Sequence, residues 1–77
     1  VKNTQIYVMT GVITQIISSK PQLAILNAGT EESPQNVMLE NSTKTTWVER
    51  QKYQIFADAY GMYVDMPRLI ARYTYKK

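Results

Sequence analysis

The first long run of β-branched residues sets the strongest limit on the fold. Residues 5–17 read QIYVMTGVITQII, and only Gly11 interrupts the pattern. This composition is typical of a β-strand, and an isolated glycine inside a strand commonly marks a bulge or a bend. One bent strand of this length can pair on both sides of a small closed sheet. The sequence therefore predicts an all-β barrel whose first strand bends at Gly11.

Four further strands are predicted from shorter apolar runs. They cover residues 22–28, 37–40, 52–60 and 67–75, and polar or turn-forming segments separate them. Between the third and fourth strands, Thr46-Trp47-Val48-Glu49 matches a capping box and predicts one short helical turn. We expect Trp47 and Val48 to fill the core. The expected architecture is a single domain over residues 1–77, a small five-stranded barrel with one short helical turn.

The last two strands predict a hairpin register. The apolar alternates are Tyr53, Ile55, Ala57 and Ala59 in the first strand, and Leu69, Ala71, Tyr73 and Tyr75 in the second. An antiparallel pairing centred on Tyr63 brings both sets onto the inner face.

The same register predicts what lies on the outer face of this hairpin. It places Asp58 opposite Arg68 and Phe56 opposite Ile70. This outward apolar pair, which Arg68 and Arg72 flank, requires a cover from a helix, a neighbouring subunit or a ligand. An exposed ion pair between Asp58 and Arg68 is the alternative interpretation of the charges.

Composition narrows the classes of function. The 77 residues contain no cysteine and no histidine, so disulfides, thiolate metal sites and the commonest general base are missing. The six acidic residues show no spacing typical of a metal site, and we expect neither an enzyme nor a cofactor. A net charge of +3 favours an anionic partner. No apolar run approaches the ~20 residues that a membrane span needs.

The connector between the last two predicted strands is unusually apolar. Residues 60–66 read YGMYVDM, where a hairpin tip is normally polar. Solvent-facing loops that keep such residues usually keep them for contact. Two interpretations stay open. Tyr60 and Tyr63 present their rings to a ligand, or Tyr63 folds over the barrel rim while Met62 and Met66 close its end.

This order of elements resembles the five-stranded OB-fold across essentially the whole chain. The resemblance rests on Gly11-Val12-Ile13 in the first strand, Trp47-Val48-Glu49 before the fourth, and residues 66–72 (MPRLIAR) in the fifth. The pattern is similar to small OB subunits that bind single-stranded nucleic acid or assemble complexes with it. SH3-like and other small barrels are the alternative folds.

The resemblance implies a ligand across the second and third strands, held by the loops after the first and fourth strands. These loops correspond to residues 18–22 and 60–66. Single-stranded nucleic acid is then the expected ligand, because its bases stack on aromatic rings beside a basic groove. The residues expected to bind it are Lys20, Lys52, Tyr60, Tyr63, Arg68 and Arg72.

The alternative function is assembly with another protein. In this interpretation a partner subunit, identical or different, docks on Phe56, Met62 and Ile70 together with the 60–66 loop.

Overall fold

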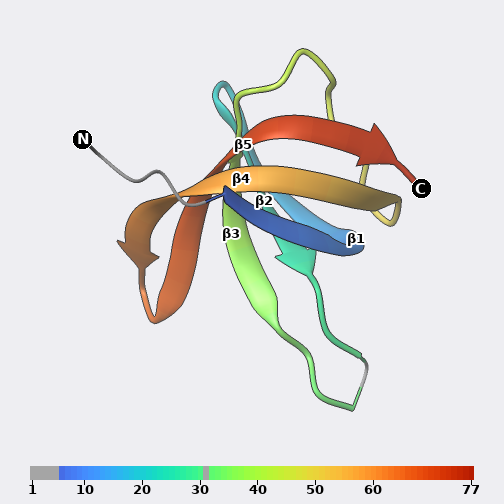
Figure 1. The fold of residues 1–77 in the computed structure, drawn as a ribbon, viewed down its shortest axis with the longest axis vertical. Helices are drawn as coiled ribbons and strands as arrows, with labels where there is room; N and C mark the ends of the chain where they lie inside the picture. The colour runs from blue at the N-terminus through green and yellow to red at the C-terminus, as the bar shows by residue number, and fades with distance from the viewer. Residues whose placement is uncertain (1–5, 31) are drawn as a thin grey trace.

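The computed structural model describes residues 6–30 and 32–77, and these residues form five β-strands without a helix. The strands are β1 (Ile6–Ser19), β2 (Gln22–Asn27), β3 (Asn36–Asn41), β4 (Lys52–Tyr63) and β5 (Met66–Lys76). They close into a barrel in the order β1-β2-β3-β5-β4 (Figure 1). The β3–β5 pair is parallel and the other pairs are antiparallel. The predicted all-β five-stranded barrel is confirmed, and it is compatible with an OB-like fold.

The first strand closes the barrel by pairing on both of its sides. Residues from Ile6 to Val12 pair with β4, and residues from Val12 to Ser19 pair with β2. Gly11 lies where the strand passes from one partner to the other. A Cβ atom at this glycine would lie 2.2 Å from the backbone oxygen of Asn27, a separation that no side chain tolerates. The bend predicted at Gly11 therefore coincides with a close approach between two backbones.

Replacing Gly11 by alanine is expected to lower the free energy of unfolding by at least about 2 kcal/mol, since backbone rather than a flexible side chain must move. Urea unfolding followed by circular dichroism measures the loss. Thr10→Ala is the control, because Thr10 is exposed on the same strand. Equal stability of the two variants would show that the bend has room to relax.

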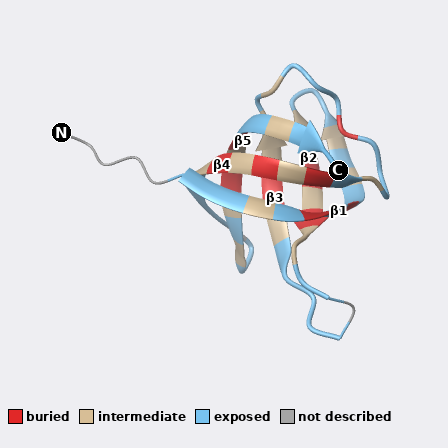
Figure 2. Ribbon diagram, turned by 45° about the vertical axis from the view of Figure 1, so that its right-hand side comes forward, coloured by how far each residue is buried: buried red, intermediate tan, exposed pale blue. Residues whose placement is uncertain are grey.

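All five strands contribute to one hydrophobic core. Its members are Ile13, Ala24, Leu26, Leu39, Trp47, Tyr53, Ile55, Ala57, Leu69 and Ala71. Figure 2 shows these buried positions alternating along the strands with exposed or half-buried ones, while the loops are mostly exposed. The expectation that Trp47 fills the core is confirmed. The same expectation for Val48 is wrong, because this side chain is exposed.

The segment between β3 and β4 is not helical, so the predicted short helical turn is wrong. The side chain of Gln22 holds both backbone groups of Trp47: the Trp47 N–H donates to its Oε1, and its Nε2 donates to the Trp47 carbonyl, each at 3.0 Å. The Glu49 carboxylate accepts the backbone N–H of Ile16 at 3.1 Å. The carboxylate that a capping box would use is thus bound to β1, and the Trp47 backbone is held by β2 instead of by a helical turn.

The hairpin of β4 and β5 is longer than predicted and has another register. β4 continues to Tyr63 and β5 begins at Met66, so most of the predicted 60–66 loop is strand. Ala57 pairs with Ala71 rather than with Leu69. Two irregularities in the ladder leave Tyr60 on β4 and Arg72 on β5 without an opposite residue.

The altered register also changes the outer face. Phe56 lies opposite Tyr73, and Ile70 lies opposite Asp58, so the predicted Phe56–Ile70 pair is wrong. The predicted ion pair between Asp58 and Arg68 is wrong as well. Each of these charged side chains has a different partner, described below.

Candidate nucleic-acid interface

The bulge at Arg72 decides where the last two tyrosines of β5 point. Before the bulge, Leu69 and Ala71 face the barrel interior and are buried. One extra residue reverses the alternation, since successive side chains of a strand point to opposite sides. Tyr73 and Tyr75, predicted to face inward, are instead 64% and 56% exposed. Thr74 takes the inward position and accepts a hydrogen bond from the indole Nε1 of Trp47 at 3.2 Å.

Two other strands, β1 and β4, place further side chains beside these rings. The pairing aligns Val8 of β1 with Phe56 of β4 and Tyr73 of β5, and it aligns Thr10 with Gln54 and Tyr75. The rings of Phe56 and Tyr75 meet edge to face, with centroids 5.8 Å apart and an interplanar angle of 86°. This contact orients one exposed ring without covering it. We call the outer surface formed by Val8, Thr10, Lys52, Gln54, Phe56, Tyr73 and Tyr75 the Tyr73–Tyr75 face.

Basic side chains lie at both ends of the Tyr73–Tyr75 face. At one end, the backbone N–H of Lys77 donates to the carbonyl of Lys52 at 2.9 Å, so two exposed lysines are neighbours. At the other end lies Arg72, whose Nε donates to Oδ2 of Asp58 at 2.7 Å. That ion pair holds the guanidinium against Asp58 of β4 and leaves the arginine side chain nearly half exposed. Exposed rings between cations are the arrangement that binds single strands.

Arg68 and Tyr60, both predicted binding residues, form a second cluster. The guanidinium carbon of Arg68 lies 4.8 Å from the centroid of the Tyr60 ring, and its Nη2 pairs with Oε1 of Glu40 at 3.1 Å. The side chains of this ion pair are only about a quarter exposed. The cluster occupies the outer face of β3 and β5, and it already satisfies its own charge. These contacts join neighbouring strands, and they leave little positive charge for a phosphate.

The other sequence-predicted residues are distributed over the barrel. Lys52 and Arg72 belong to the Tyr73–Tyr75 face, whereas Lys20 lies in the turn between β1 and β2, at the barrel end opposite the β4–β5 tip (Figure 1). Met62 is exposed near that tip, and Ile70 is half-buried among β3, β4 and β5. The side chain of Tyr63 lies outside the described part of the structure, so its role stays a prediction.

The described residues show neither a metal-binding cluster nor a membrane-spanning helix. Among residues 6–30 and 32–77, no three acidic side chains lie close enough together to hold a metal ion. In the same ranges, no helix is long and apolar enough to cross a membrane. Comparison with known proteins finds no matching family model, no similar curated protein and no similar solved structure. The function is therefore argued from the geometry of this chain.

Proposed function

We propose that this protein is a non-catalytic OB-like module that binds single-stranded nucleic acid through the Tyr73–Tyr75 face. One observation carries the proposal: two exposed rings stand on the same side of one strand, with cations at both ends of the row. Residues two apart on a strand are about 6.8 Å apart, which lets two unstacked bases each lie on a ring. Stacking of this kind is worth ~1–3 kcal/mol per base and tolerates any sequence.

The charge of the surface supports a polyanionic ligand. Asp58 is the acidic residue that touches the Tyr73–Tyr75 face, and its Oδ2 is held by Arg72. Lys52 and Lys77 are exposed and form no ion pair with any described residue, so they can contact phosphates at the far end of the row. A strand laid along the rings thus meets the positive charge of Lys52 and Lys77 at one end, the half-exposed Arg72–Asp58 pair at the other, and aromatic surface between them.

A titration with a fluorescently labelled 12-nucleotide oligo-dT tests the proposal. We expect saturable binding at low salt, and log K falling against log salt with a slope of about −1.5 to −2 if two or three phosphates are neutralised. Lys52→Gln should reduce that slope by about 0.7, because one contact is lost. Lys20→Gln, the same change in the β1–β2 turn, is the control. An absence of saturable binding at low salt would overturn the proposal.

A protein partner is the second candidate, and one observation favours it. Ile6 and Val8 of β1 are exposed and point to the same side as Phe56, which extends the apolar part of this surface. Exposed apolar patches of this kind mark contact sites. Sedimentation of the purified protein and of Val8→Lys separates the two candidates. Self-association abolished by Val8→Lys, without any oligonucleotide binding, would favour assembly.

A further inference from the structure

The last part of β5 has one edge that pairs with nothing among the described residues. β3 pairs with β5 only over Arg68–Ala71, and the backbone N–H of Ser42 makes the final bond to the Ala71 carbonyl at 3.1 Å. From Arg72 to Lys76 the described partners of the β5 backbone all belong to β4. Unpaired backbone groups along a strand edge are a template for another strand.

The hydrogen-bond pattern identifies the backbone groups on this edge. The bond from the Lys77 N–H to the Lys52 carbonyl marks a hydrogen-bonded pair of the antiparallel ladder. Because such pairs alternate, the N–H and C=O groups of Tyr75 and Tyr73 point to β4. Those of Thr74 and Lys76 point the other way, to the free edge. The edge thus offers alternating donors and acceptors.

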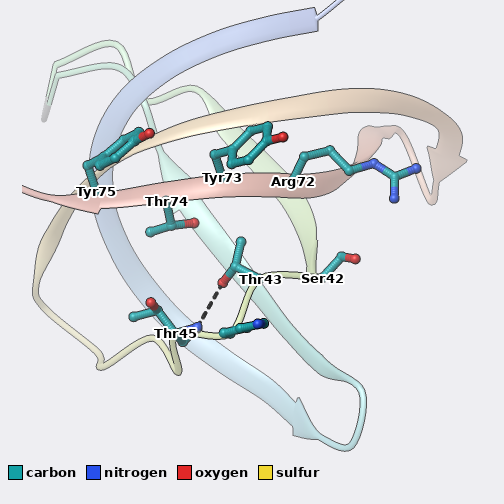
Figure 3. A pocket seen from close by; sticks show the side chains of 8 residues that line it. Ser42, Thr43, Thr45, Arg72, Tyr73, Thr74 and Tyr75 are labelled. Carbon is teal, nitrogen blue, oxygen red and sulfur yellow. Dashed lines mark hydrogen bonds between the residues drawn. The ribbon is translucent and has the colours of Figure 1, made fainter.

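A groove runs along this edge. Figure 3 shows the space between β5 and the loop of residues 42–45, and this pocket measures about 360 Å³. The loop satisfies its own polar groups: the Asn41 side chain binds the Thr45 carbonyl at 2.6 Å and the Thr43 N–H at 2.8 Å, and Thr45 N–H donates to the Thr43 hydroxyl. It forms a fixed wall that leaves the edge of β5 open. We call this space the β5 groove.

The charges around the β5 groove are basic. Lys44 lines it and Lys76 follows at its end, while Arg72 lines it with a guanidinium already paired to Asp58. No aspartate or glutamate is among the lining residues. Lysines on a free edge discourage pairing with a second copy of the same strand, because like charges would meet. An incoming strand with carboxylates has the matching charge.

We propose that the β5 groove binds an extended acidic peptide segment, which adds as a strand beside residues 72–76. Such a segment supplies both N–H and C=O groups at the spacing of the free edge, and its carboxylates face Lys44 and Lys76. A phosphodiester strand has no backbone N–H donors, so it cannot pair with the alternating N–H and C=O groups of the β5 edge. This inference goes beyond the proposed nucleic-acid function and does not depend on it.

The test uses ¹⁵N-labelled protein and the peptide acetyl-EVEVEVE-amide, followed by backbone amide shifts. We expect saturable shifts at peptide concentrations of about 0.1–1 mM, confined to residues 42–45 and 72–76. The same peptide with an N-methyl group on every residue keeps its charge but offers no N–H donor from either of its edges. Its affinity is expected to fall about tenfold or more, as is that of the unmodified peptide for the Lys44→Glu/Lys76→Glu variant.

Controls separate strand addition from simple attraction. Lys20→Glu makes the same charge change outside the groove and should leave the affinity within about twofold. Equal binding of the N-methylated peptide would overturn the proposal, since attraction alone would then explain the shifts. Peptide-induced shifts centred outside residues 42–45 and 72–76 would overturn it as well. So would a result in which oligo-dT shifts these residues and the peptide does not shift them. Amide spectra of each free variant confirm that it is folded.

Discussion

Replacing Tyr73 and Tyr75 together by alanine is expected to weaken binding of labelled oligo-dT at least about 30-fold, because two stacking surfaces worth ~1–3 kcal/mol each are removed. Both rings stand on the outer side of β5 and are more than half exposed. Their removal leaves Lys52, Lys77 and Arg72 in place, so the remaining binding should be electrostatic and strongly salt-dependent. Fluorescence anisotropy at one fixed low salt concentration measures the change in dissociation constant.

Tyr60→Ala is the matched control for this experiment. Tyr60 is as exposed as Tyr75, but its ring packs against Arg68 and lies off the Tyr73–Tyr75 face. We expect the affinity of the Tyr60→Ala variant for oligo-dT to stay within about twofold of the affinity of the unsubstituted protein. A larger loss for Tyr60→Ala than for the double variant would move the binding site to the outer face of β3 and β5. Circular dichroism of each variant shows whether the barrel is intact.

Trp47→Ala is expected to reduce the free energy of unfolding by about 3–5 kcal/mol, the usual cost of a large cavity in a core. Trp47 is 2% exposed, and its indole Nε1 donates to the Thr74 hydroxyl. A domain of this size has a total stability of about 4–12 kcal/mol, so a substantial part of the protein should unfold. Urea unfolding followed by circular dichroism gives the difference.

Two further substitutions identify the cause of that loss. Trp47→Phe keeps an aromatic ring but removes the donor to Thr74, and it should cost about 1–2 kcal/mol. Val48→Ala changes the exposed neighbour and should alter stability by less than about 0.5 kcal/mol. Equal stability of Trp47→Ala and Val48→Ala would show that the non-helical segment does not close the barrel.

The sequence predicts the barrel well because apolar residues recur at alternate positions in its strands. The first strand and its glycine bend, and the inward positions Ile55, Ala57, Leu69 and Ala71, follow from alternation alone. The bulge at Arg72 does not follow, because no residue type there requires one. The bulge at Tyr60 has a signal in Gly61, a strand glycine with a φ of +151°. Trp47 and Tyr53 already occupy the core, together with eight smaller or aliphatic residues.

The apolar segment from Tyr60 to Met66 illustrates the same limit. Its composition indicates contact, but Tyr60, Met62 and Val64 all stay exposed in the barrel itself. Tyr60 packs on Arg68, and the segment extends the strands of a long hairpin that turns at Val64 and Asp65. The exposed rings lie further along β5, where the sequence pattern places them in the core.

Backbone amide shifts of ¹⁵N-labelled protein during a titration with oligo-dT locate the bound strand residue by residue. Binding at the Tyr73–Tyr75 face predicts changes in residues 8–10, 52–56 and 73–77, which form this face and its basic end. Changes centred instead on residues 20–25, 38–40 and 68, or no changes at low salt, would contradict it.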